Sequence, residues 1–408
     1  MEKGLRMTEE SRSKILITVI TSALMIAIFA AVYFINKSNN RDRDSIIVGF
    51  LYDGDESTPY TANFIRAQKV VERKYGDRVE VKVKRNVNGD EGDEKALSEL
   101  IAEGCDLIFI NSYGETARKI AGNNPDVQFC QVASDASGVN PASDNYHTFM
   151  GEIYQGRYIT GVVAGMKLKE MIDNGDITVD EAKVGYVAAY PYAEVISGYT
   201  AFFLGVRSVV PDALMEVKYT NTWSDFALEK KCALELIERG CVIISQHSDT
   251  TGPALACEQM YAVKQVYHVS YNQSSIDAAP TTSLVGSRIN WEPYISGAVE
   301  AVLRDKKIEK TVEGDVHGND IGAGLDMGWV EILELNSHIA APGSKEKIDE
   351  LTEDFIEGRI EVYKGDYIGV NPDDESDTIY LKNGYTECEN CSAPTFSYVL
   401  KGVINVVE

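Results

Sequence analysis

An internal repeat constrains the fold of this chain more than any other feature. The segment LSELIAEGCDLIFINSYG at 97–114 aligns with ALELIERGCVIISQHSDT at 233–250 after a shift of 136 positions. The same shift places VGFLYD at 48–53 over VGYVAA at 184–189. Two separate stretches with one offset indicate that the chain contains two halves with the same order of strands and helices.

Each half reads as strand, helix, strand, helix, strand. The first half contains the strand patterns IIVGFLYD, VEVKVKR and CDLIFIN, and the second contains KVGYVAA, LMEVKYT and CVIISQ. Apolar strands that alternate with helices are typical of parallel sheets covered on both faces. The sequence therefore predicts an α/β protein with two Rossmann-like, doubly wound lobes joined by a hinge.

Polar loops follow the predicted strands directly. The apolar run CVII at 241–244 leads into SQHSDTTGP, and other strands lead into DGDESTPY, NSYGET, YPYAEV, NTWSD and YNQSS. Ligands of doubly wound sheets bind outside the carboxyl ends of the strands. We therefore expect these loops to meet at a ligand cleft between the two lobes.

The same loops are rich in aromatic side chains: Tyr60, Tyr113, Tyr192, Trp223 and Trp291. Flat rings combined with amides and a carboxylate suit a flat heteroaromatic ligand, stacked on its faces and hydrogen-bonded at its edges. A purine fits this description. Ordinary packing in the core or the hinge is the alternative for any single ring.

An apolar segment at 15–35 has 21 positions without a charge. At about 1.5 Å per residue it is long enough to cross a hydrocarbon core of about 30 Å. The following AAVYFINKS offers no clean cleavage site and no cysteine for lipid attachment, so an uncleaved signal anchor is favoured over a cleaved signal. The prediction is a cytoplasmic stub at 1–14, a single transmembrane helix at 15–36 and an ectodomain outside the cell membrane.

The charge balance disfavours one class of partner. The formal net charge is −24, and nucleic-acid binding draws most of its affinity from basic contacts to phosphates. Most of the seven cysteines lie in or beside strand or helix patterns, which is typical of buried small hydrophobic residues. Cys388 and Cys391 form the pattern CENC without a second ligand pair, which favours a local disulfide or two free thiols over zinc.

Several long stretches carry a family resemblance: IYQGRYITGVVAGM, VGYVAAYPYAEVISGYTAFFLGVRSVVPDA, NTWSD and SQHSDTTGPA. In these the chain resembles the basic membrane protein (BMP) family of extracytoplasmic solute-binding proteins, which includes the purine nucleoside receptor lipoproteins, over roughly 46–360. The resemblance implies a type I periplasmic-binding-protein fold with three crossovers, no catalysis and no cofactor. It also implies that the protein captures a nucleoside or nucleobase for an ABC importer.

The resemblance also implies ligand contacts. Tyr60 matches the aromatic residue that covers the base, and Tyr113 and Trp223 match further walls of the site. Polar contacts are expected from Asp249 and from Asn272, where relatives usually carry an aspartate. The returning segment of the first lobe contributes Asn290 and Trp291.

Two departures limit what the resemblance implies. The segment DESTPYTANF lacks the Phe-Asn pair that nucleoside-binding members carry after the first strand, so a free base such as adenine is at least as well supported as a nucleoside. Relatives are usually lipoproteins, whereas this chain has an apolar anchor. The expected division is 45–150 with about 273–322 for the first lobe, 151–272 with about 323–360 for the second, and a strand-rich extension at 361–408.

Two other functions are considered. An enzyme could use His247 and Asp249 as a base and its orienting group, but the sequence shows no nucleophile for them and no Gly-x-Ser-x-Gly elbow. A sensor that signals to a membrane partner is the second alternative, although the stub of about 14 residues leaves no room for a signalling domain.

Overall fold

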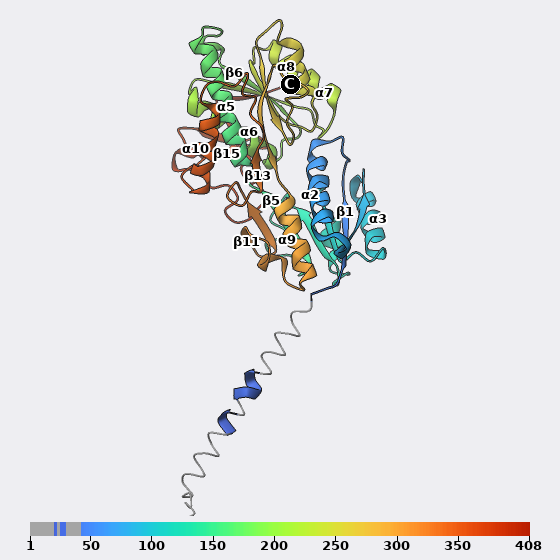
Figure 1. Cartoon of the computed structure of the whole chain (residues 1–408). Helices are drawn as coiled ribbons and strands as arrows, with labels where there is room; N and C mark the ends of the chain where they lie inside the picture. Colours follow the sequence, from blue (N-terminus) through green and yellow to red (C-terminus); the bar gives the residue numbers. More distant parts are fainter. Residues whose placement is uncertain (1–19, 23–24, 30–41) are drawn as a thin grey trace, which may run out of the picture.

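The computed structural model describes residues 20–22, 25–29 and 42–408. Residues 42–408 form two lobes stacked one on the other, with β1 (Ile46–Leu51), α2 (Pro59–Tyr75) and α3 (Gly89–Ala102) in the lower lobe of Figure 1. Each lobe has a seven-stranded sheet, and a three-stranded sheet is added by the C-terminal residues. The two-lobed α/β architecture predicted from the repeat is confirmed.

Lobe one is built on a sheet with the strand order β11-β12-β5-β4-β3-β1-β2. Helices α2 and α9 pack together on one face, and α3 and α4 pack together on the other. The elements are β1 (Ile46–Leu51), α2 (Pro59–Tyr75), β2 (Val79–Lys84), α3 (Gly89–Ala102), β3 (Leu107–Ile110), α4 (Thr116–Ala121), β4 (Gln128–Val132), β5 (Tyr146–Gly151), α9 (Glu292–Leu303), β11 (Asp315–His317) and β12 (Asp320–Ala323).

Lobe two has the strand order β13-β10-β9-β8-β6-β7-β17. Helix α5 packs against α6 and α10, whereas α7 packs against α8. The elements are α5 (Ile153–Asp173), β6 (Lys183–Ala188), α6 (Ala193–Val209), β7 (Leu214–Tyr219), α7 (Phe226–Glu238), β8 (Ile243–His247), α8 (Gly252–Met260), β9 (Tyr267–Tyr271), β10 (Ser283–Ile289), β13 (Val330–Ile332), α10 (Ser344–Ile356) and β17 (Ile404–Val407).

The structure explains why the repeat is visible in the sequence. Gly49 of β1 leaves room for Leu100, Cys105 and Ile108, because a Cβ at this glycine would lie 3.1 to 3.3 Å from their side chains. Gly185 of β6, 136 positions later, stands in the same relation to Leu236, Cys241 and Ile244. The repeated residues therefore fill the same tight niche between helix and sheet in each lobe.

Three crossovers join the lobes: β5 to α5, β10 to α9, and β12 to β13. The strands on either side lie next to one another, since Gly151 pairs with Ala323 and Ile289 pairs with Val330. The sequence places the second crossing near residue 273, and this position is wrong. Strand β10 is parallel to β9 in the sheet of lobe two, so the chain returns to lobe one only after Ile289.

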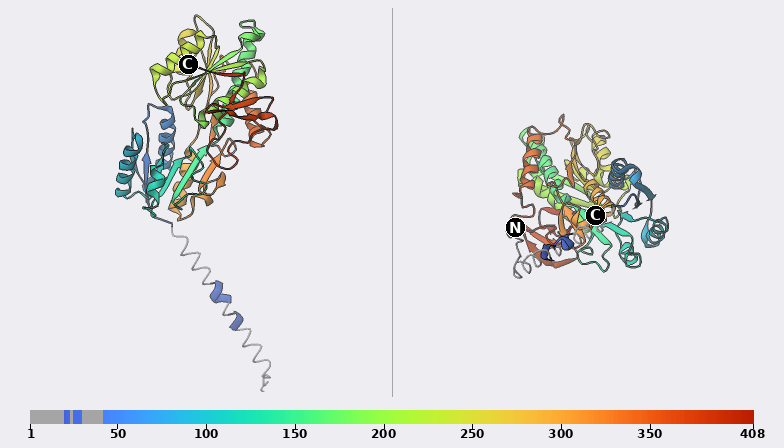
Figure 2. Two further views of the ribbon diagram at one scale, coloured as in Figure 1. Left: turned by 180° about the vertical axis from the view of Figure 1, so that it is seen from behind. Right: turned by 60° about the horizontal axis from the view of Figure 1, so that its bottom comes forward.

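The last residues form an extension beside the junction of the lobes, drawn in red in Figure 2. Strands β14 (Ile368–Asn371), β15 (Asp374–Tyr380) and β16 (Val399–Leu400) make the small sheet. Strand β17 then pairs in parallel with β7 and becomes an edge strand of lobe two.

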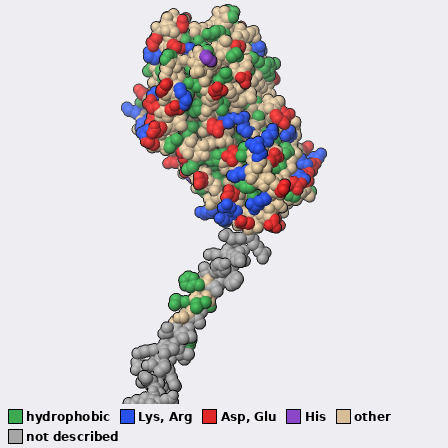
Figure 3. All heavy atoms as spheres, in the orientation of Figure 1, with side chains coloured by type: hydrophobic (Ala, Val, Ile, Leu, Met, Phe, Trp, Pro, Cys, Tyr) green, Lys and Arg blue, Asp and Glu red, His purple; other side chains and the backbone are tan. Residues whose placement is uncertain are grey.

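Within the described residues, no helix is both long enough and apolar enough to cross a bilayer. The transmembrane helix predicted at 15–36 lies largely outside the described residues and stays a prediction. On the face shown in Figure 3, acidic and basic side chains of the two lobes lie interspersed.

Helices α5 and α6 approach each other so closely that glycine is required at their contact. A Cβ at Gly161 would lie 1.9 Å from the carbonyl oxygen of Phe202. We expect Gly161→Ala to lower the free energy of unfolding by about 2 to 4 kcal/mol, because backbone atoms must separate to admit the methyl group. Urea denaturation followed by tryptophan fluorescence measures this loss.

Gly92→Ala is the matched control, since it also lies in a helix but its Cβ would stand 3.4 Å from the nearest atom, in Val87. We expect this variant to be as stable as the wild type or slightly more stable, because alanine favours helix. Equal losses in the two variants would contradict the close-contact explanation.

Candidate ligand site between the lobes

A cavity of about 180 Å³ lies between the lobes. It is lined by Asp53, Tyr60, Asn111, Ser112, Tyr113, Glu194, Trp223, His247, Asp249, Tyr271 and Asn272. Most of these residues follow the carboxyl ends of parallel strands or begin the next helix, as expected for doubly wound sheets. Both lobes contribute, so the cavity is shaped by how the lobes meet.

Five of the eight predicted contact residues line this cavity: Tyr60, Tyr113, Trp223, Asp249 and Asn272. Lobe one provides Tyr60 from the first turn of α2 and Tyr113 from the loop after β3. Lobe two provides Trp223 after β7, Asp249 after β8 and Asn272 after β9. The structure thus brings together residues that are up to 212 positions apart in the chain.

Three predicted residues do not line the cavity. Trp291 is only 1% exposed and stacks on Phe64 with ring centroids 4.4 Å apart, so it supports Tyr60 from behind. The side chain of Asn290 donates a hydrogen bond to the Gly328 carbonyl and fastens two crossovers together. Tyr192 is 52% exposed and stacks on Tyr190 outside the cavity.

Aromatic rings form much of the cavity wall. Tyr113 of lobe one meets Trp223 of lobe two edge to face, with centroids 6.2 Å apart. The hydroxyl of Tyr60 donates to the Asn111 carbonyl at 2.8 Å, which fixes the ring at the cavity. Tyr271 adds a further ring from β9. The walls can therefore contact both faces of a planar ligand.

Lobe one presents a hydrogen-bonded carboxyl group at the end of β1. Asp53 Oδ1 accepts from Thr61 Oγ1 and from Asn111 Nδ2, both at 3.0 Å. Its backbone N–H donates to Asn111 Oδ1 at 2.9 Å. Burial raises the pKa of Asp53, while these hydrogen bonds act in the opposite direction. The orientation of this acceptor is thus set by the protein itself.

Lobe two presents a second carboxyl group, on Asp249. Asn272 Nδ2 donates to Asp249 Oδ1 at 3.0 Å. Asn272 has a positive φ of 63°, a conformation that asparagine adopts more readily than most residues, and its carbonyl accepts from Asn63 of lobe one at 3.1 Å. Burial raises the pKa of Asp249 to about 8, and the nearby carboxylates of Glu229, Asp53 and Glu194 contribute.

A third polar group links the lobes directly. The Tyr113 hydroxyl of lobe one donates to Glu194 Oε2 of lobe two at 2.5 Å. His247 Nε2 lies 3.4 Å from Glu194 Oε1. Burial would raise the pKa of Glu194, but His247, Tyr113 and the positive charge of Arg157 together hold it below its usual range. These contacts therefore favour the ionised form of Glu194.

Arg157 does not line the cavity, but its positive charge stabilises the ionised form of Glu194. Its guanidinium lies 3.6 Å from the centroid of the Tyr271 ring and donates to the Gln246 carbonyl at 3.0 Å. Burial lowers the pKa of His247, and the charge of Arg157 adds to that effect while Glu194 opposes it. Among the described residues, no lysine or arginine lines the cavity, which suits an uncharged ligand better than a phosphate.

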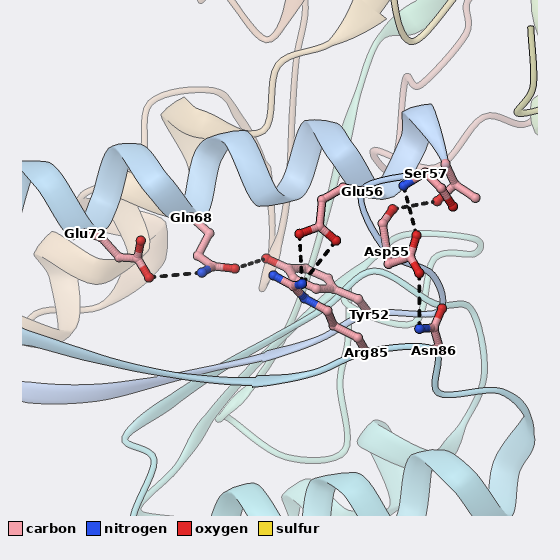
Figure 4. Close-up of polar contacts among 9 residues, drawn as sticks. Tyr52, Asp55, Glu56, Ser57, Gln68, Glu72, Arg85 and Asn86 are labelled. Carbon is pink, nitrogen blue, oxygen red and sulfur yellow. Dashed lines mark hydrogen bonds and ion pairs between the residues drawn. The ribbon is translucent and has the colours of Figure 1, made fainter.

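The loop after β1 contains acidic residues that do not enter the cavity. Figure 4 shows Glu56 and Asp55 facing the residues that follow β2. Arg85 Nη1 donates to Glu56 Oε1 at 2.9 Å, and Asn86 Nδ2 donates to Asp55 Oδ2 at 3.3 Å. These contacts hold the loop in place and leave Asp53 as its cavity-facing carboxyl.

Six lining residues were not predicted as ligand contacts: Asp53, Asn111, Ser112, Glu194, His247 and Tyr271. All six lie in the polar segments that follow the predicted strands, and two of them, His247 and Tyr271, are also the last residues of strands β8 and β9. Glu194 at the start of α6 reads equally as a residue that complements the helix dipole. The hydrogen bond to Tyr113 of the other lobe leaves no local sequence signal.

The raised pKa of Asp249 predicts how the stability of the ligand-free protein depends on pH. The pKa is about 8 in the folded protein and 3.8 in the unfolded chain. The folded state therefore keeps this proton where the unfolded chain has lost it, so the contribution is complete at low pH and is lost as pH rises through 8. Between pH 7 and 9 we expect a loss of about 1 kcal/mol.

Asp249→Asn is expected to remove that part of the decline. Chemical denaturation at pH 7, 8 and 9 compares the two proteins. Glu152 and Glu387, whose pKa values burial raises to about 7, titrate in the same direction and are present in both proteins. The same decline in wild type and variant would show that Asp249 is ionised in the folded state.

The fold and the site together define the class of protein to which this chain belongs. Two doubly wound lobes, three crossovers and a cavity lined from both lobes are the features of a solute-binding protein of the periplasmic type. Residues 45–366 match the family model of PnrA-like ABC transporter substrate-binding proteins (Bmp), and the chain belongs to this family. It is a binding protein and not an enzyme.

Similar proteins carry different ligand names. The chain is 30% identical to the purine-binding protein of Brucella abortus (strain 2308), across 79% of this chain and 84% of that protein. It is 25% identical to a Haloferax volcanii protein whose name refers to glucose binding, across 67% of this chain and 63% of that protein. These names differ in the ligand they state, so the residues that line the cavity are the better guide to the ligand of this protein.

Solved structures agree with the fold. An ABC transporter solute-binding protein from Aeropyrum pernix K1 superposes with a TM-score of 0.62 at 16% identity, covering 81% of this chain and 95% of that one. A solute-binding protein from Conexibacter woesei gives a TM-score of 0.59 at 18% identity, covering 78% and 98%. These similarities concern the fold alone.

Proposed function

We propose that this protein binds a purine-type ligand, and a free nucleobase in preference to a nucleoside, for delivery to an ABC importer. The observation that carries the proposal is the composition of the cavity wall. Tyr60 and Tyr113 from lobe one face a site shared with Trp223 and Tyr271 from lobe two, and carboxyl and amide groups lie between the rings. A flat ring with polar edges satisfies both kinds of group.

Asp249 provides the pairing that a purine edge requires. With a pKa of about 8, its carboxyl group is largely protonated at neutral pH and carries a donor and an acceptor side by side. An exocyclic amine beside a ring nitrogen presents the complementary acceptor and donor. Glucose has no such edge, although its hydroxyl groups could pair with the same carboxyls singly.

The size of the cavity favours a base over a nucleoside. About 180 Å³ is small compared with the roughly 300 to 1,000 Å³ of sites for drug-sized ligands. The absence of the Phe-Asn pair from the loop after β1 points the same way, because relatives that bind nucleosides carry it. The similarity to a purine-binding protein supports the ligand class.

Calorimetric titration of the purified protein tests the proposal. Adenine, adenosine, guanosine and inosine are titrated in turn, with glucose as the competing ligand class. We expect a purine to bind and the base to bind more tightly than its nucleoside. Binding of glucose with no response to any purine would overturn the ligand assignment and leave the solute-binding class intact.

We further propose that residues 15–36 hold the protein on the outer side of the cell membrane. Their uncharged length and the absence of a clean cleavage site support this proposal. N-terminal sequencing of the protein from native membranes tests it. A mature form that begins near Asn39 would show that the segment is removed.

A further inference from the structure

The extension at the C-terminus lies beyond the part of the chain that the family shares. The family match ends at residue 366, whereas the chain continues to 408. The small sheet of β14, β15 and β16 and the loop between β15 and β16 therefore lie outside the residues that match the family model. This segment contains the CENC pattern at 388–391.

The extension is fastened firmly to lobe two. Strand β17 pairs with β7 over Ile404–Val407. Phe396 stacks on Tyr363 with centroids 4.5 Å apart, and the Tyr363 hydroxyl lies 2.6 Å from Ser197 Oγ of α6. These contacts hold the C-terminal end of the loop 387–396 and the strand that follows it to lobe two.

The same loop also forms hydrogen bonds with lobe one. The backbone N–H of Ser392 donates to Asp320 Oδ2 at 2.5 Å, and its hydroxyl donates to Asp320 Oδ1 at 2.6 Å. Asp320 is fully buried in β12 and also accepts from Thr148 of β5. A Cβ at Gly322 would lie 3.0 Å from Ser392, so the two segments are in close contact. The extension thus bridges the two lobes beside the crossovers.

Cys391 directly precedes this bridging residue, and Cys388 lies four positions before it. Both are free thiols, 8% and 6% exposed, and both sulfur atoms approach the Ala393 carbonyl oxygen, at 3.9 and 3.6 Å. Cys388 Sγ also lies 3.4 Å from the Ser392 carbonyl oxygen. Two thiols three positions apart therefore converge on the backbone that carries Ser392.

We propose that Cys388 and Cys391 form a disulfide outside the cytoplasm, and that this bond fixes the Ser392 contact through which the extension restrains lobe one. The oxidant is a disulfide, either of a protein or of a small thiol. One cysteine thiolate attacks it and releases one thiol, and the second cysteine then displaces the other. Two electrons and two protons pass to the oxidant, which leaves as two thiols.

The environment fits a bond made while the loop forms and kept afterwards. Burial raises the pKa of Cys388 well above its usual value, and the neighbouring Glu387 and Glu152 add to this effect. The thiolate needed for exchange is therefore scarce once the loop has closed. Disulfides persist in oxidising compartments, which suits the extracytoplasmic family to which this chain belongs.

The first test reads the redox state of the full-length protein. The protein is isolated from the cells that produce it without reductant, denatured with iodoacetamide present, and mapped by peptide mass spectrometry. We expect the peptide with Cys388 and Cys391 to be unalkylated and lighter by two hydrogen atoms, and to take two alkyl groups after reduction. Alkylation of both cysteines before reduction would overturn the proposal.

The second test reads the restraint by hydrogen exchange of the ligand-free protein. We expect reduction to speed exchange at 389–393 and in β12 by roughly ten- to thirtyfold, because a short closed loop loses its constraint. The double variant Cys388→Ser/Cys391→Ser should match the reduced wild type. Cys257→Ala, in the core of lobe two, should keep the redox response.

Two variants at the contact with lobe one separate the bond from the restraint. In Asp320→Asn, and to a smaller extent in Ser392→Ala, reduction should still change exchange at 389–393 but should no longer change exchange in β12. A redox response in β12 that persists in both variants would overturn the restraint. Identical exchange in oxidised and reduced wild type would overturn it as well.

Discussion

Replacing Asp249 by alanine is expected to weaken purine binding by about 30- to 1,000-fold. The carboxyl group is held by Asn272 and lies on the cavity wall, so its removal leaves both Asn272 Nδ2 and the ligand edge without a partner. Truncating one member of a buried hydrogen-bonded pair costs about 2 to 4 kcal/mol. At about 1.4 kcal/mol for each factor of ten, this cost gives the expected range.

Calorimetric titration measures the effect, with the folded fraction determined separately by circular dichroism. Asp249→Asn keeps the shape and one acceptor, so we expect it to recover part of the affinity. Asp55→Ala is the matched control: it removes another carboxyl near the cavity, but this one faces Asn86 and does not line the site. Similar losses in Asp249→Ala and Asp55→Ala would show that the effect is general electrostatics.

Trp223→Ala is expected to raise the dissociation constant by roughly five- to 150-fold. The indole lines the cavity and meets Tyr113 across the lobe boundary. Stacking of a base on an aromatic side chain is worth about 1 to 3 kcal/mol. Trp223→Phe should recover much of the loss because a ring remains.

A packing role for Trp223 predicts a different result. It would lower the melting temperature of both variants and leave the affinity of each folded molecule unchanged. Tyr192→Ala is the matched control, because it removes a ring that contacts Trp223 from outside the cavity. We expect less than about a threefold change in affinity for this variant.

The two-lobed architecture could be predicted because the repeated residues are those that pack a helix closely against the sheet in each lobe. Gly49 and Gly185 each require the same small and branched neighbours, so the sequence itself shows that the chain contains two equivalent sheets. The order of strands and loops then places polar loops at one edge of each sheet. This reasoning located five of the eleven lining residues directly, and it located the loop segments that carry the other six.

The predictions from the sequence that were wrong or incomplete failed for physical reasons. SLVGSRI at 283–289 fits either lobe, and only its pairing with β9 assigns it to lobe two. Trp291 follows a strand, as a ligand contact would, yet its ring stacks on Phe64 and does not reach the cavity. Glu194 has no clear role in the sequence because its partner Tyr113 is 81 positions away and in the other lobe. Contacts between lobes depend on three-dimensional packing that local patterns do not encode.

The strands that complete the two sheets follow all the other strands of their sheet in the sequence. Lobe one receives β11 and β12 only at 315–323, and lobe two receives β17 only at 404–407. While the ribosome is still at work, both sheets therefore have open edges, and their non-local pairings cannot yet form. Each sheet is therefore completed only after the chain has passed through the other lobe, so the last strand pairings of both lobes join residues far apart in the sequence.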